Sequence, residues 1–137
     1  MGINVDGLAK SVNEILSEYA DDVNEGVKVS AQEVGKQTVK QLRATSPKPK
    51  GRKAKYARSW RQKTTQDRLG NTQTVVYNDK YGQLTHLLEN GHFNRDGSFT
   101  KGRPHIKPAE DMAVEAFVNE VEKNIGIMKM FLIKFRN

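Results

Sequence analysis

Three histidines, His86, His92 and His105, are the residues of this sequence best suited to metal binding or acid–base chemistry. Glu89 and Asp96 lie among them and could add carboxylate ligands. His86 and His92 are six positions apart and straddle the expected end of a short helix, so they do not share a helical face. A structural zinc site usually needs four ligands, many of them thiolates, and the chain has no cysteine. We therefore expect no metal and no other cofactor.

A nuclease centre could be assembled from His92, Asn94, Asp96 and His105. These residues lack the spacing of a His-Asn-His motif, and no pair of acids is placed to hold magnesium. Ser98 follows a glycine but shows no nucleophile-elbow pattern. The nearby glycines are not followed by the Lys-Ser/Thr of a phosphate-binding loop. We expect no catalytic residue and no enzyme, and a small nuclease is the least favoured alternative.

The charged residues are distributed unevenly along the chain, which has 137 residues and a net charge of +7. Residues 1–33 carry a net −5, residues 34–66 a net +11 and residues 67–137 a net +1. Such a basic block often binds nucleic acid by neutralising phosphates, and it equally suits an acidic protein partner. The candidate residues for contact with DNA or an acidic partner are Lys48, Lys50, Arg52, Lys53, Lys55 and Arg58.

A long N-terminal helix is the first element that must position these groups. Apolar residues recur at steps of three and four from Leu8 to Leu42, which predicts a helix over residues 7–43. Such a helix would be about 55 Å long, whereas a compact domain of this size is only about 37 Å across. Either the helix breaks near Gly26 or Gly35, or its far end packs on another subunit. We favour the contact with another subunit.

A basic linker and a β-hairpin follow the helix. Residues 45–55 contain two prolines, one glycine and five basic residues, so we expect a mobile linker. Tyr56–Thr65 and Thr72–Tyr77 are rich in Tyr, Trp, Thr and Val and are separated by turn residues, which predicts two antiparallel strands. Trp60, the only tryptophan, is interpreted as a core anchor rather than a platform for stacking bases.

A short helix and a projecting loop come next. Leu84, Leu87 and Leu88 have the spacing of one amphipathic helix. Gly91 lies just past the last of them, where a left-handed glycine commonly ends a helix. Residues 92–102 are polar and rich in glycine, so we expect them to form an exposed loop.

A stiff arm and a C-terminal helix complete the chain. Pro104 and Pro108 fix φ and bias the residues before them towards extended conformations. Pro108 suits the first helical position, and apolar residues from Met112 to Ile125 predict the helix itself. Residues 126–137 are strongly apolar and either extend this helix or add an edge strand. We expect them to be covered by the core or by a neighbouring subunit.

Together these elements predict a single α+β domain over residues 1–137. The long N-terminal helix and the C-terminal helix pack on a small antiparallel β-sheet, with the short helix and the projecting loop between them. No apolar run reaches the roughly 20 residues that cross a membrane. The N-terminus also lacks the pattern of a signal peptide, so we expect a cytoplasm-like compartment.

The stretch from Tyr81 to Ala109 resembles the tail-component family of long-tailed bacteriophages, which are tail-completion or head–tail joining proteins. The family pattern is a Tyr-led short helix that ends in an acid-x-Gly turn, a variable loop, and a Pro-x-(Ile/Phe)-x-Pro-Ala arm that opens the last helix. The residues of this chain that match it are Tyr81, Glu89, Gly91, Pro104, Ile106, Pro108 and Ala109. Leu84 and Leu88 anchor the same stretch and complete the predicted motif and interface residues.

The resemblance implies a structural subunit without catalysis. Copies of this subunit would assemble as a ring, expected to be sixfold, at the head-proximal end of the tail. Its partners would be further copies of itself, a tail-tube or tail-terminator protein and a head-completion protein (connector or stopper). DNA would lie nearby, and no membrane is involved. The protein would belong to the virion, at the head–tail junction, after assembly in the host bacterial cytoplasm. Two alternatives stay open: a nucleic-acid-binding module that uses residues 36–68, and a tail terminator.

Overall fold

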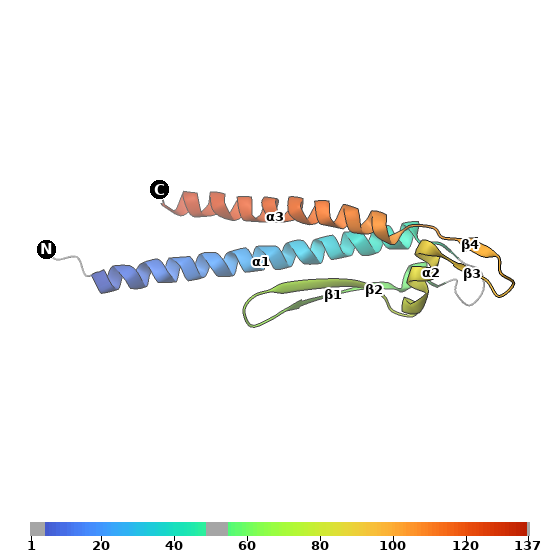
Figure 1. The fold of residues 1–137 in the computed structure, drawn as a ribbon. Coiled ribbons are helices and arrows are strands. Elements are labelled where there is room, and N and C mark those ends of the chain that lie inside the picture. The colour runs from blue at the N-terminus through green and yellow to red at the C-terminus, as the bar shows by residue number, and fades with distance from the viewer. Residues whose placement is uncertain (1–4, 49–54, 137) are drawn as a thin grey trace.

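One long helix, α1 (Val5–Thr45), forms the axis of the molecule, and every other element lies along it or at its C-terminal end (Figure 1). The computed structural model describes residues 5–48 and 55–136; for Val5 and residues 127–136 it describes only the backbone. A second helix, α3 (Ile106–Arg136), runs antiparallel to α1 along one side. A β-hairpin lies along another side of α1 (Figure 1).

The helix α1 has 41 residues and is not interrupted at Gly26 or Gly35. At about 1.5 Å per residue it is about 60 Å long. Its N-terminal end extends beyond the C-terminal end of α3 (Figure 1), which confirms the predicted overhang. The hairpin approaches α1 closely at Gly35, where a Cβ would collide with the Gln62 side chain. The contact of the overhang with another subunit stays a prediction.

The hairpin consists of β1 (Trp60–Gln66) and β2 (Thr72–Asn78), which pair antiparallel from Trp60↔Asn78 to Gln66↔Thr72. The first strand was predicted to begin at Tyr56. This start is wrong, because a 3₁₀ turn, η2 (Ala57–Ser59), precedes β1. That turn brings the ring of Tyr56 into the core, where it is fully buried. The core thus overrides the β-propensity of this tyrosine.

The predicted short helix is split into a 3₁₀ turn, η3 (Gly82–Leu84), and α2 (Thr85–Asn90). The next segment was predicted as an exposed loop without strands; it contains two short strands, β3 (Gly91–Phe93) and β4 (Phe99–Lys101), which form a second antiparallel hairpin. The β3–β4 hairpin does project from the end of the molecule, as predicted (Figure 1).

The C-terminal helix α3 begins at Ile106, two residues before the predicted start. Pro108 is therefore the third residue of the helix instead of the first. It is still tolerated there, because the N–H groups of the first turn have no partner within the helix. The backbone stays helical to Arg136, so residues 126–136 extend the helix and do not add a strand. We predicted that the core or a neighbouring subunit covers their side chains, and this prediction concerns side chains outside the described part of the chain.

The hydrophobic core lies at the C-terminal end of α1, where η2, β1, α2 and α3 meet. Trp60 is almost fully buried there, and its Nε1 donates a hydrogen bond to Ser46 Oγ (2.8 Å), which confirms its role as a core anchor. The predicted α+β arrangement is confirmed. Residues 49–54 of the predicted linker lie outside the described residues, whereas Ser46 and Pro47 at its start are buried. The buried core residues are Val39, Leu42, Tyr56, Trp60 and Ala109, with Val76, Tyr81, Leu88 and Ile106 packed against them.

Candidate functional site

The predicted motif residues separate into a buried and an exposed group. Ala109 belongs to the core, and Tyr81, Leu88 and Ile106 pack against it. Leu84 is half-buried, while Pro104 and Pro108 are exposed. The motif therefore fastens α2 and the start of α3 to the core, and the β3–β4 hairpin lies between these two attachments.

Glu89, at the end of α2, caps the N-terminus of α3. Its Oε2 accepts hydrogen bonds from the backbone N–H groups of His105 (2.7 Å) and Ile106 (2.8 Å), and its Oε1 accepts one from Lys107 (3.0 Å). These N–H groups have no acceptor within a helix, and the helix dipole makes this end positive. One carboxylate thus joins the two ends of the motif across the hairpin.

His105 forms a buried link between this cap and Tyr56. Its Nδ1 lies 2.8 Å from the carbonyl of Arg103 and 3.0 Å from Glu89 Oε2, and both of these are acceptors. Nδ1 therefore carries the proton in the neutral ring, and Nε2 accepts from the Tyr56 hydroxyl at 2.8 Å. Tyr56, His105 and Trp60 also pack edge to face, with ring centroids 5.7 to 6.3 Å apart.

Two pKa shifts follow from this arrangement. Partial desolvation opposes ionisation of Glu89, but the three backbone N–H donors and the nearby His105 outweigh it and lower the pKa of its carboxyl. Burial, together with the negative charge of Glu89, raises the pKa of Tyr56 to about 12. Tyr56 therefore keeps its proton at neutral pH and remains the donor to His105. The unit serves as a structural clamp, because its polar atoms bind one another inside the protein.

The chain crosses over itself closely at the base of the β3–β4 hairpin. Gly91 has φ +88° and ψ 174°, which L-residues with side chains rarely adopt. The predicted glycine is therefore required, although its conformation is extended and not the left-handed helical one. A Cβ on Gly91 would lie 2.6 Å from the carbonyl oxygen of Thr100, and a Cβ on Gly102 would lie 2.5 Å from that of Glu89.

The tip of the β3–β4 hairpin carries an exposed aromatic pair. Phe93 and Phe99 face each other across the strands, with ring centroids 5.1 Å apart, and are 78% and 55% exposed. Asp96 accepts hydrogen bonds from the N–H and hydroxyl of Ser98, which fixes the turn and lowers the pKa of Asp96. Exposed aromatic rings on a firmly held hairpin are typical of a contact surface.

Of the residues considered for metal or nuclease chemistry, His105 and Glu89 are in contact, but the others are not gathered around this pair. His105 is buried beside Tyr56, whereas Asn94 and Asp96 lie in the exposed turn of the β3–β4 hairpin. Among the described residues there is no group of three His, Asp or Glu side chains that could hold a metal ion.

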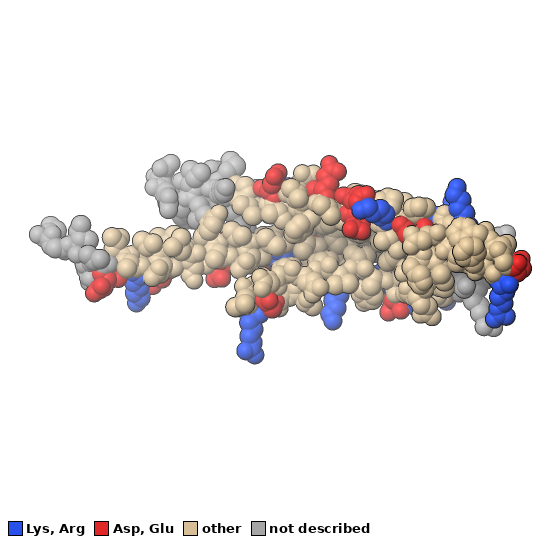
Figure 2. All heavy atoms as spheres, viewed as in Figure 1, with Lys and Arg blue, Asp and Glu red and all other residues tan. Residues whose placement is uncertain are grey.

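The basic block of the sequence forms a surface on α1 and β1. Lys36, Lys40 and Arg43 of α1 and Arg61 of β1 line a hollow of about 430 Å³. Of the predicted contact residues, Lys48, Lys55 and Arg58 are exposed, while Lys50, Arg52 and Lys53 lie outside the described residues. On the face shown in Figure 2, acidic side chains lie along α3 and near the N-terminal end of α1.

The sequence did not predict the link between Tyr56 and His105. They are 49 positions apart, and neither has a spacing that predicts a contact. It also missed Asn78, which is buried, donates to the carbonyl of Tyr56 (2.9 Å) and accepts from the N–H of Tyr81 (2.9 Å). The one available signal was the position of His105 between the two prolines of the motif.

The fold and the motif region define an α+β protein in which a clamped base supports a projecting hairpin. Residues 7–91 match the family described as "Bacteriophage HK97-gp10, putative tail-component", and the chain belongs to this family. The match includes Tyr81, Glu89 and Gly91 and ends before Pro104. Neither a curated protein nor a solved structure matches the chain. None of the helices in the described part of the chain is both long and apolar enough to pass through a membrane.

Proposed function

We propose that this chain is a tail-completion or head–tail joining subunit that assembles as a ring at the head-proximal end of the phage tail. Membership of a phage tail-component family gives it a structural role in the virion. The finer assignment is supported by the resemblance of the stretch from Tyr81 to Ala109 and by the shape of the subunit.

The observation that carries this proposal is that one elongated subunit exposes large apolar side chains at both of its ends. The overhanging end of α1 lies at one end and the β3–β4 hairpin at the other (Figure 1). In this proposal the exposed end of α1 contacts another part of the next copy, and such head-to-tail contacts close into a ring when the rotation permits. The proposed ring is expected to contain six copies. Its exposed Phe93 and Phe99 contact one of the neighbouring proteins: a head-completion protein, a tail-tube protein or a tail-terminator protein.

Labelling of intact particles tests the proposed location. Antibodies against the purified chain, visualised by electron microscopy, should bind at the junction between head and tail, and binding should increase when heads are detached. A label spread along the tail, located at its distal tip or absent from purified particles would overturn the assignment.

A second candidate function, nucleic-acid binding, is favoured by one specific observation, the hollow lined by Lys36, Lys40, Arg43 and Arg61. Side chains of one sign around a concave surface attract phosphates. If this were the main function, the isolated chain would bind duplex DNA tightly, with a steep loss of affinity as salt rises. Changing these residues would then abolish binding without affecting particle assembly.

A further inference from the structure

We propose that the free chain forms a dimer in which the α1 helices of two copies pack antiparallel through a charged stripe on their surface. The charged stripe consists of an acidic half (Glu14, Glu18 and Asp22) and a basic half (Lys36, Lys40 and Arg43). This contact goes beyond the proposed function and does not depend on it, because it uses a different face of α1 from the apolar residues at the exposed end.

Both halves of the charged stripe lie on one face of α1. Residues within each half are three or four positions apart, which is the spacing of neighbouring side chains on a helix face. Lys36 follows Glu18 by 18 positions, or five turns at about 3.6 residues each, so the two halves point in the same direction. All six side chains are exposed.

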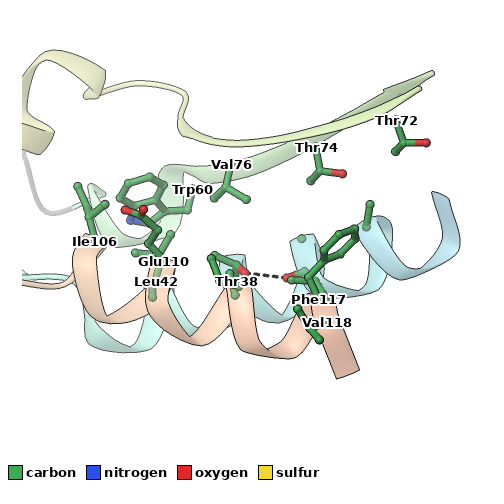
Figure 3. Close-up of a pocket in the computed structure, with 16 residues that line it drawn as sticks. Thr38, Leu42, Trp60, Thr72, Thr74, Val76, Ile106, Glu110, Phe117 and Val118 are labelled. Carbon is green, nitrogen blue, oxygen red and sulfur yellow. Dashed lines mark hydrogen bonds between the residues drawn. The ribbon is translucent and has the colours of Figure 1, made fainter. Parts of the chain in front are cut away.

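The helix α3 and the β1–β2 hairpin pack on other faces of α1 and leave the charged stripe open. Thr38 and Leu42 are buried and line a pocket between α1, β2 and α3 (Figure 3). Each of them follows a lysine of the stripe by two positions, which is about 200° around the helix. The buried face of α1 thus lies opposite the stripe, which is open to a partner over about 44 Å, from Glu14 to Arg43.

The charges of the stripe form no ion pair with other described residues. The ion pairs in that part of the chain lie at the start of α3. Within the stripe, Glu18 is four positions from both Glu14 and Asp22, and Lys40 is four positions from Lys36. Like charges at this spacing destabilise a helix. A partner with the opposite order of charges would relieve this repulsion.

The order of charges along the stripe is self-complementary about Val29. Glu18 and Lys40 are each 11 positions from Val29, and Asp22 and Lys36 are each 7 positions from it. Two identical helices that pack antiparallel across a two-fold axis at Val29 bring together residues equally far from the axis. Glu18 of each copy would then face Lys40 of the other copy. Asp22 would face Lys36 in the same way.

The residues at the ends and at the centre of the stripe fit the same arrangement. Glu14 and Arg43 are 15 and 14 positions from Val29, so they form a further pair. Glu25 would face the neutral Gln32, since these residues are four and three positions from the centre. Val29 is 46% exposed and would meet Val29 of the second copy on the axis, where the two apolar side chains cover each other.

A hollow beside the basic half provides room for the acidic side chains of the second copy. It has a volume of about 430 Å³ and is also lined by Arg61 of β1. Arg43 and Arg61 both donate to the carbonyl oxygen of Trp60, each at 2.9 Å, which holds two guanidinium groups close together. Glu14 of the second copy would lie level with this pair, and its carboxylate would offset the repulsion between them.

The antiparallel arrangement pairs both halves of each helix at once. A parallel pair shifted along the helix axis could join the acidic half of one copy to the basic half of the next, but it would leave the other two halves unpaired. The antiparallel pair therefore makes more contacts between opposite charges, over the full length of the stripe. Because the contact is isologous, it closes with two copies.

Light scattering coupled to size-exclusion chromatography tests this dimer. The wild type should have the mass of two copies at low ionic strength and dissociate near about 1 M salt, where the screening length falls to about 3 Å. The acid-reversed variant, Glu18→Lys/Asp22→Lys, and the base-reversed variant, Lys36→Glu/Lys40→Glu, place like charges opposite each other. Each should weaken dimerisation by at least about tenfold, while its circular dichroism remains that of the wild type.

Restoring the order of charges distinguishes this contact from a loss of folding. A chain with all four changes has its acidic and basic halves exchanged and should dimerise nearly as well as the wild type. A 1:1 mixture of the acid-reversed and base-reversed variants should form a heterodimer. Glu115→Lys/Glu122→Lys, at exposed positions of α3, matches the acid-reversed variant in net charge and should dimerise like the wild type.

Cysteine crosslinking tests the orientation of the helices, since the chain has no cysteine of its own. The Val29→Cys variant places its thiol at the axis and should crosslink two copies on oxidation. Ser11 lies on the same face, 18 positions from Val29. In an antiparallel pair the two thiols of the Ser11→Cys variant would be about 54 Å apart and should not crosslink.

A wild-type chain that stays monomeric at low salt, or a chain with exchanged halves that stays monomeric, would overturn the proposal. Equal crosslinking at both cysteine positions would indicate a parallel pair and would overturn it as well. The same holds if the wild type binds duplex DNA through the basic half without dimerising.

Discussion

The carboxylate of Glu89 stabilises the start of α3 only while it is ionised, so its contribution depends on pH. Its pKa is lowered in the folded protein, and the contribution is therefore complete above the ordinary carboxyl range near about 4.3 and is lost as pH falls through and below it. Glu89→Gln should lower the free energy of unfolding by about 2 kcal/mol at pH 7, because the amide replaces a charged acceptor of three N–H groups. Urea unfolding across the acid range measures this.

The difference between the wild type and Glu89→Gln should shrink as pH falls. Glu122→Gln serves as a control, since Glu122 is an exposed residue of α3, and its stability at neutral pH should stay near that of the wild type. A constant difference between wild type and Glu89→Gln at every pH would show that the charge of Glu89 is not what stabilises α3.

Tyr56→Phe should cost about 1–2 kcal/mol, because it keeps the buried ring but leaves Nε2 of His105 without its donor. Tyr77→Phe, on the exposed outer face of the β1–β2 hairpin, is the matched control and should change little. The pKa of Tyr56 is raised from 10.0 to about 12, so the wild type should lose stability as pH rises through this range. Denaturant unfolding should show this alkaline loss reduced in Tyr56→Phe; an equal loss in both proteins would remove Tyr56 from the network.

At the level of residues, the sequence predicted single anchors better than pairs. Trp60 and Leu88 could be assigned to the core from their type and spacing. Glu89 and Gly91 could be identified as motif residues from the family pattern. The sequence could not predict that Glu89 caps the helix beyond the hairpin, because this bond spans 16 to 18 positions. Such contacts depend on how the elements pack.

At the level of elements, the base of the β3–β4 hairpin depends on Gly91. Gly91→Ala should lower the free energy of unfolding by about 2–3 kcal/mol, because the backbone has a positive φ and the new Cβ would lie 2.6 Å from the carbonyl oxygen of Thr100. Gly82→Ala is the control, since a Cβ there would meet nothing within 4 Å. Thermal unfolding of both variants gives the comparison. Equal stability of the two would mean that the base of this hairpin is not strained by a side chain.

Deletion of residues 93–101 should leave the fold intact and prevent head–tail joining. The deletion removes the aromatic tip, and the remaining ends lie close together, because Gly91 pairs with Lys101 and approaches Gly102. A tip variant with Phe93→Ser and Phe99→Ser tests the same surface without shortening the chain. Infectious particles assembled from either protein would contradict the docking role of this hairpin.

Long, strongly periodic elements were predictable, and short ones were not. The pattern from Leu8 to Leu42 placed α1 within two residues at each end. The sequence does not predict the strands of the β3–β4 hairpin, because they have three residues each and turn residues dominate the composition of this segment. The start of β1 was misplaced because burial of Tyr56 outweighs its strand propensity.

At the level of the whole molecule, the overhang of α1 followed from length alone, since about 60 Å of helix exceeds the width of a compact domain. A pocket of about 510 Å³ is lined by residues of α1, β2 and α3, and the sequence could not predict it, because it depends on how elements distant in sequence pack on α1. The division of charge was visible in the sequence, but only the fold places the acidic and basic segments at different ends of one helix.

The most direct test of the central claim is a joining assay with purified components. Heads and tails from phage that lack this protein would be mixed with the purified chain, and joined particles would be counted by electron microscopy. We predict that heads and tails stay separate without the protein and join when it is added. Joining in its absence, or separate heads and tails after its addition, would contradict the assignment of this chain to the head–tail junction.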